Sequence, residues 1–186
     1  MEELIKISKK YCQKHYSNLE YHNFDHALDV FEVVCQRSKN LSEEEKLLLK
    51  LAALFHDVVV EHKEDDEAQS AKKAEEFLKS HLDSQQIKII EELILSTKMP
   101  QNPKTKLQKI ICDADLDNLG RDDFFKKGEL LRQELGKKKE LWEKETLVFL
   151  KKHKYHTLQA RNERDIQKKK HIKELEKRIL PNPKPL

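Results

Sequence analysis

Residues 47–60 read LLLKLAALFHDVVV, the most apolar stretch of the chain, and the fold depends on this stretch. Its apolar residues recur at the three- and four-residue spacing of an α-helix and predict a helix with a broad buried face. Ser42 and Glu45 precede it with the spacing of a capping box, which marks a helix start. His56 and Asp57 interrupt the stretch, so it is too short and too polar to span a membrane.

Helical spacing of apolar residues continues on both sides of this stretch, and no convincing strand alternation occurs. The chain holds only three glycines and five prolines, so few residues interrupt long helices. Pro181 and Pro183 stop the last helical pattern. We therefore expect an all-α fold, with a single domain over residues 1–180 and a flexible tail over residues 181–186.

The length and composition fit one globular domain. A chain of 186 residues builds one core, and 37% hydrophobic content in this pattern is too much for a disordered chain. The three cysteines, Cys12, Cys35 and Cys112, lie far apart and form no C-x-x-C pair, which argues against a disulfide framework or a zinc knuckle. The first residues lack the apolar run of a secretion signal. We expect reduced thiols and a cytoplasmic location.

The net charge of +3 conceals an uneven distribution. Residues 1–120 hold 17 Lys and Arg against 23 Asp and Glu, a net charge of −6, whereas residues 121–186 hold 20 against 11, a net charge of +9. A basic segment attracts phosphate-bearing ligands or nucleic acid. A solvated lysine face on amphipathic helices explains most of these lysines more simply, so nucleic acid is not favoured as a partner. A homo-oligomer is left open.

Histidines and acids gather in four segments, at residues 21–26, 55–57, 61–70 and 112–115, and three of these segments lie at or near an end of an apolar helix. Polar side chains beside a buried face are costly unless they are paired or bind a metal ion. Taken singly, His56 is better explained as a core histidine and Asp57 as a capping group. Together with His26 and the Asp-Ala-Asp segment at 113–115, they favour one divalent ion. Imidazole and carboxylate suit Mn, Fe, Co, Ni or Zn, with Mg at lower affinity.

The order His…His-Asp…Asp on helices resembles the HD-domain superfamily of metal-dependent phosphohydrolases. The finer pattern looks like its uncharacterised, predicted-phosphohydrolase branch, over roughly residues 15–175. This resemblance implies a helical HD-domain fold with a metal site between core helices. The matching pieces are YHNFDHALDV (21–30), ALFHDVVVE (53–61), DEAQSA (66–71), ICDADLDNLG (111–120), LLRQEL (130–135) and Tyr155-His156-Thr157.

The resemblance also implies a role for matching residues. His26, His56, Asp57 and Asp115 correspond to the family's metal ligands, with Asp113 as the alternative to Asp115. Asp57 also orients or deprotonates the attacking water. The implied reaction is metal-assisted hydrolysis of a phosphoester in a nucleotide or another small phosphorylated metabolite.

Three further residues are candidates for handling the substrate. His22, four residues before His26, either contacts a substrate phosphate or belongs to a helix cap. Glu67 positions water or protonates the leaving group, with Glu61 as the competing candidate, unless both are solvated loop acids. Arg132 either binds phosphate through its planar guanidinium or forms a surface salt bridge.

The chain departs from the branch at residues 96–100, where Ser-Thr-Lys-Met-Pro lacks an expected histidine. Two-metal HD proteins need additional histidines in this region, so we expect a single ion. The missing histidine also motivates an alternative, a degenerate HD protein that binds metal or nucleotide without turnover. No Walker loop, G-x-G-x-x-G or G-x-S-x-G motif occurs. The function that the resemblance implies, and that we favour, is a metal-dependent phosphohydrolase.

Overall fold

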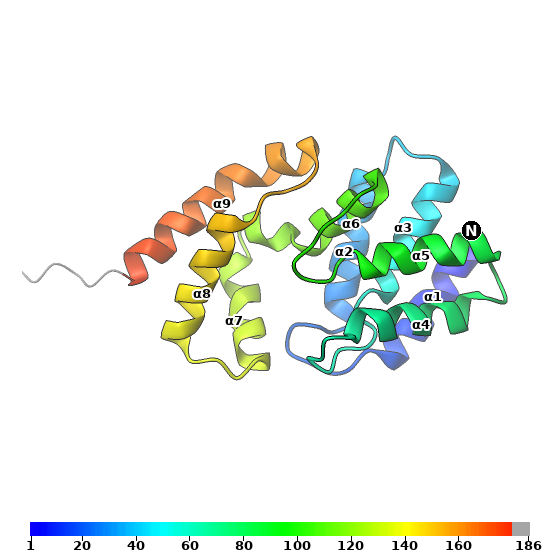
Figure 1. Ribbon diagram of the computed structural model, residues 1–186, viewed down its shortest axis with the longest axis horizontal. Helices are drawn as coiled ribbons and strands as arrows, with labels where there is room; N and C mark the ends of the chain where they lie inside the picture. The colour runs from blue at the N-terminus through cyan, green and yellow to red at the C-terminus, as the bar shows by residue number, and fades with distance from the viewer. Residues whose placement is uncertain (180–186) are drawn as a thin grey trace, which may run out of the picture. The chain divides into compact units, whose positions relative to one another are not determined.

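The computed structural model describes residues 1–179, and in this part of the chain it contains nine α-helices, one short 3-10 helix and no strand (Figure 1). The predicted all-α fold is confirmed. These residues pack as two compact units, one over residues 1–115 and one from residue 116 onward. Packing alone does not decide how many domains fold independently, so the single domain over 1–180 stays a prediction. The tail expected over 181–186 lies outside the described residues.

The first unit is built around α3, which packs against the other five helices of the unit. Eight of the 13 residues of α3 are buried, which explains why this helix is apolar on nearly all sides. Helices α4 and α5 pack side by side next to it (Figure 1). The helices of this unit are α1 (Glu2–His15), α2 (Phe24–Arg37), α3 (Glu43–Phe55), α4 (Asp66–Leu78), α5 (Ser84–Leu95) and α6 (Lys106–Asp115).

The start of α3 is fixed by the capping box expected from the sequence. The Ser42 hydroxyl accepts the backbone N–H of Glu45 at 3.2 Å, and the Glu45 carboxylate accepts the backbone N–H of Ser42 at 2.9 Å. Two amides that the first helical turn leaves without partners are thereby satisfied. Asp83 caps α5 in the same reciprocal way with Gln86.

The second unit has its own small apolar core. The 3-10 helix η1 packs against α7 and α9, and α8 packs against α9. Within the part of the chain that the structure describes, every helix is too short or too polar to cross a bilayer. The elements of this unit are η1 (Asp117–Gly120), α7 (Phe124–Glu134), α8 (Lys139–Lys152) and α9 (Leu158–Ile179), and its buried core residues are Leu119, Phe124, Leu150, Tyr155, Ala160 and Leu175.

Candidate metal centre

The ends of three helices bring His26, His56, Asp57 and Asp115 together in the first unit. His26 lies in the first turn of α2, His56 caps the C-terminal end of α3 and precedes Asp57, and Asp115 is the last residue of α6. One ligand atom from each residue lies within 4.8 Å of the other three. The four ligands predicted from the sequence therefore form one group, named here the His/Asp cluster.

The separations within the His/Asp cluster fit a shared ion. Nε2 of His26 lies 3.3 Å from Nε2 of His56, 3.5 Å from Oδ2 of Asp57 and 3.4 Å from Oδ1 of Asp115. Nε2 of His56 lies 3.1 Å from Oδ2 of Asp57 and 3.6 Å from Oδ1 of Asp115. Atoms that share an ion at about 2.0–2.2 Å lie about 3.0–3.5 Å from one another, so this donor set suits a divalent metal.

A hydrogen bond fixes the ring of His56. Its Nδ1 lies 2.9 Å from the carbonyl oxygen of Ala53, and because that oxygen can only accept, Nδ1 carries the proton. In the neutral ring, Nε2 then presents its lone pair to the His/Asp cluster, which is the arrangement of a metal-ligating histidine. The ring is almost fully buried, with 1% of the side chain exposed, so little water reaches it.

The pKa shifts show that the His/Asp cluster attracts a cation. Burial lowers the pKa of His26. Burial acts the same way on His56, but Asp57 and Asp115 outweigh it and hold the pKa of His56 well above its usual value. Burial opposes ionisation of both carboxyls, yet the two histidines keep the pKa of Asp57 and of Asp115 below the usual range. Two carboxylates and a proton-holding imidazole converge on one point, where a metal ion can replace the proton.

The first turn of α2 is anchored by Asn23, so His26 enters the cluster in a fixed direction. The Asn23 side-chain oxygen accepts the backbone N–H of Asp25 at 3.0 Å and of His26 at 3.2 Å. Its Nδ2 donates to the carbonyl of Leu19 at 2.9 Å. This N-cap links the preceding loop to α2 and fixes the backbone of His26, three residues after Asn23.

Two residues that the sequence analysis missed contact the cluster. The Tyr16 hydroxyl accepts the backbone N–H of Asp57 at 3.3 Å, and Gln101 donates through Nε2 to Oδ2 of Asp115 at 3.1 Å. Burial first, and then the charge of Asp57, raises the pKa of Tyr16 well above its usual value, so the phenol stays protonated. Neither residue belongs to an apolar stripe or a family motif. The signal for Gln101 was its place directly after the segment that lacks the expected histidine.

His22 and Glu67, both predicted to handle the substrate, lie beside the cluster without belonging to it. The ring centroid of His22 is 5.9 Å from that of His26, and the charge of His22 helps to lower the pKa of Asp57. Glu67 is the second residue of α4, and burial, with a contribution from Asp57, raises its pKa. Their roles toward a substrate stay predictions.

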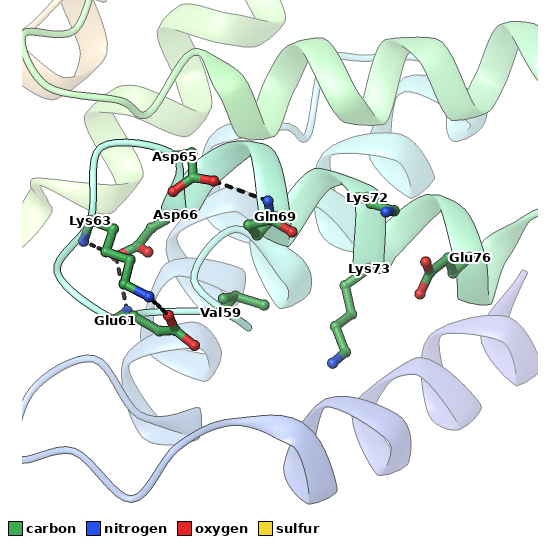
Figure 2. A pocket seen from close by; sticks show the side chains of 9 residues that line it. All are labelled: Val59, Glu61, Lys63, Asp65, Asp66, Gln69, Lys72, Lys73 and Glu76. Atoms are coloured by element: carbon green, nitrogen blue, oxygen red, sulfur yellow. Dashed lines mark hydrogen bonds and ion pairs between the residues drawn. The ribbon is translucent and has the colours of Figure 1, made fainter.

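Glu61, the competing candidate, faces a different feature. It lines a hollow of about 420 Å³ formed by the loop after Asp57 and by α4 (Figure 2). Its carboxylate pairs with Lys63, and its backbone N–H donates to Asp66 at 3.0 Å. Both acids and lysines line this hollow, and the His/Asp cluster contributes no side chain to it. The remaining lining residues are Val59, Asp65, Gln69, Lys72, Lys73 and Glu76.

Asp113 is not a member of the His/Asp cluster, and Arg132 belongs to the second unit. Asp113 is fully buried and its carbonyl accepts a hydrogen bond from Arg37 at 2.9 Å, so the residue of this segment that joins the cluster is Asp115. Arg132 lies on α7 in the second unit, where its guanidinium binds both carboxylate oxygens of Glu129 at 2.9 and 2.7 Å. Phosphate binding by Arg132 stays a prediction that requires exchange of this partner.

Comparison with known proteins agrees with this geometry. A family model described as HD domain matches residues 23–117, just over half of the chain. The matched span contains all four residues of the His/Asp cluster. No curated protein matches the chain.

Proposed function

This chain belongs to the HD-domain family, and from that premise we propose that it is a metal-dependent phosphohydrolase acting on a nucleotide or another small phosphorylated metabolite. One observation carries the proposal. Two buried imidazoles and two carboxylates surround one point inside the span that the family model matches. Membership of the family and this donor set together suggest a phosphohydrolase, and the substrate class is the further step of the proposal.

The residues present fit one divalent ion. His26, His56, Asp57 and Asp115 would hold it, and their nitrogen and oxygen donors suit Mn, Fe, Co, Ni or Zn, with Mg bound more weakly. When bound, such an ion supplies a water whose pKa falls from about 15.7 toward about 7, and it neutralises charge on the phosphoryl oxygen.

Asp57 and Glu67 have pKa shifts in opposite directions, which suits them to different steps. The lowered pKa of Asp57 keeps it a carboxylate, so it can accept the proton of the attacking water and orient that water toward phosphorus. The raised pKa of Glu67 favours its protonated form, so it can give its proton to the leaving oxygen. Two acids whose pKa values are shifted in opposite directions are commonly assigned as the base and the acid of one reaction.

Cationic groups near these acids support binding of the phosphate. His22 acts electrostatically on Asp57, and a protonated imidazole at that place attracts a phosphoryl oxygen. The ammonium of Lys98 donates to the carbonyl of Glu64 at 2.5 Å and acts on Glu67. We assign phosphate binding to His22, with Lys98 as a neighbouring positive charge.

The test is a screen of phosphomonoesters, nucleotides and cyclic nucleotides with the full chain, stripped of metal and then supplied with each divalent ion in turn. We expect turnover that depends on metal and falls at least about 100-fold in His56→Ala and Asp57→Asn. His15→Ala is the matched control, because His15 also bonds a backbone carbonyl one turn earlier, at 2.7 Å from that of Tyr11, but is exposed and outside the cluster.

Two results would contradict the proposal. Turnover that both cluster variants retain would refute the mechanism. Tight stoichiometric nucleotide binding with no turnover under any metal would instead favour the alternative of a degenerate HD protein. Glu67→Gln separates acid catalysis from binding, because it should lower kcat about 100-fold or more and leave metal affinity unchanged.

A further inference from the structure

Gln101 gives the two oxygens of Asp115 different partners. Its Nε2 donates to Oδ2 at 3.1 Å, whereas Oδ1 of the same carboxylate lies 3.4 Å from Nε2 of His26 and 3.6 Å from Nε2 of His56. A carboxylate held by one oxygen cannot rotate freely about its last bond. The contact therefore selects the oxygen that faces the His/Asp cluster.

The amide of Gln101 has only one orientation that fits this contact. Nε2 of the amide donates to Oδ2 of Asp115 at 3.1 Å, and a carboxylate that ligates a metal ion accepts hydrogen bonds but donates none. If the amide were turned over, Oε1 would face Oδ2, and two acceptors would repel each other. Nε2 must face Asp115, so the position of Oε1 follows from the contact.

Oε1 of Gln101 is a buried acceptor without a donor among the described residues. The two polar atoms of an amide lie about 2.2 Å apart, so Oε1 is within roughly 5.5 Å of the Asp115 carboxylate. A buried acceptor without a partner is unfavourable, and such atoms in native folds call for an explanation. Among the orphaned buried side-chain atoms of residues 1–179, this is the one whose own side chain bonds a cluster residue.

We propose that Gln101 is a positioning residue of the metal centre. Its N–H holds Asp115 with Oδ1 toward the histidines, and its Oε1 accepts a hydrogen bond from an O–H donor that arrives with the hydrated ion. This inference rests on the proposed function only in requiring that the His/Asp cluster binds a metal. On this inference, Oε1 of Gln101 has no hydrogen-bond donor in the metal-free centre, and the hydrated ion provides one.

The experiment measures metal affinity and thermal stability of the full chain with Gln101→Met, which keeps the side-chain length and removes both polar groups. Calorimetric titration uses whichever of Mn²⁺, Co²⁺ or Zn²⁺ the wild type binds most tightly. We expect the affinity to fall about 10- to 100-fold, as for other residues that orient a metal ligand. The melting temperature of the metal-free variant should stay close to that of the wild type, because loss of the hydrogen bond to Asp115 and removal of the orphaned acceptor have opposite effects on stability. A merely structural glutamine would lower it.

The matched control is Gln159→Met, because Gln159 also donates to a carboxylate, that of Glu163 at 2.9 Å, on an exposed face of α9. This variant should bind metal as the wild type does. The variant His56→Ala shows whether a negative result contradicts the metal site itself or only the role of Gln101. If the wild type binds no ion, or His56→Ala binds as tightly as the wild type, the proposed site is wrong and this inference falls with it. If only His56→Ala loses metal while Gln101→Met stays within twofold of the wild type, or melts several degrees lower without metal, this inference alone is overturned.

Discussion

The hydroxyl of Ser70 bonds both backbone polar groups of Val59: it accepts the N–H at 3.0 Å and donates to the carbonyl at 3.1 Å. Ser70 is fully buried on α4, and Val59 follows Asp57 by two residues. This pair ties α4, which carries Glu67, to the segment that carries a cluster ligand. Ser70→Ala should leave both backbone groups unpaired and lower the free energy of unfolding by about 1–3 kcal/mol.

Urea unfolding of the metal-free chain measures this loss. Ser80→Ala is the control, because Ser80 is exposed and its hydroxyl bonds only the neighbouring His81 among the described residues, so its removal should change stability by no more than about 0.5 kcal/mol. Equal stabilities of the two variants would mean that the Ser70 contacts do not hold the loop.

Metal binding should stabilise the chain through Asp115. An ion that binds only the folded state adds about 2.7 kcal/mol to the free energy of unfolding at 100 times its Kd. Asp115→Asn removes the charge with little change of shape, so we expect most of this increment to disappear. Asp25→Asn is the control, since Asp25 is exposed next to His26. Unfolding curves recorded with and without the ion measure this increment in the free energy of unfolding. If Asp115→Asn keeps the increment, Asp115 is not a ligand.

Gly120 permits the close approach of η1 to α9. A Cβ added there would lie 2.5 Å from both Cβ and the backbone oxygen of Arg164. Gly120→Ala should therefore force the backbone apart and cost about 1–3 kcal/mol. Gly128→Ala provides the contrast within the same unit, because the nearest atom, Nε1 of Trp142, is 3.9 Å away and α7 gains about 0.5–1 kcal/mol from alanine. Denaturant midpoints that move in the same direction for both would contradict this account.

Local patterns sufficed to predict most helices. The Ser42 and Glu45 spacing located the start of α3, and the apolar stretch of residues 47–55 predicted its buried face, because both depend on neighbours in sequence. Three of the four cluster residues stand directly at helix ends, where the polar residue interrupts an apolar pattern and is visible without a structure.

The residues around the ligands depended on loop conformations, which the sequence does not reveal. Tyr16 and Gln101 lie outside the helices, and their contacts with Asp57 and Asp115 join segments 41 and 14 residues apart. Arg132 shows the opposite case, since its motif suggested a phosphate ligand but a glutamate three residues earlier occupies the guanidinium. The spacing of apolar residues along the sequence does not predict which polar side chains will pair.

His153 should make the second unit sensitive to acid. Burial first, and then the charge of Lys168, lowers the pKa of His153 to about 3, and its Nδ1 lies 3.2 Å from the Lys168 ammonium. The unfolded chain, in which histidine titrates near 6.5, takes up the proton first. The contribution of His153 to stability is therefore complete above about pH 6.5 and is lost as the pH falls toward 3, by at most about 1.4 kcal/mol per pH unit.

His153→Gln tests this, because the amide does not titrate and can still accept from Lys168. Free energies of unfolding at pH 7 and pH 5, measured without metal, avoid the range in which most carboxyls titrate. We expect the wild type to lose about 1–2 kcal/mol more than His153→Gln between these two pH values, after allowance for the partial exposure of the ring. His15→Gln should follow the wild type, because His15 is exposed on α1. Parallel losses in the wild type and His153→Gln would show that His153 takes up its proton in the folded state as readily as in the unfolded chain.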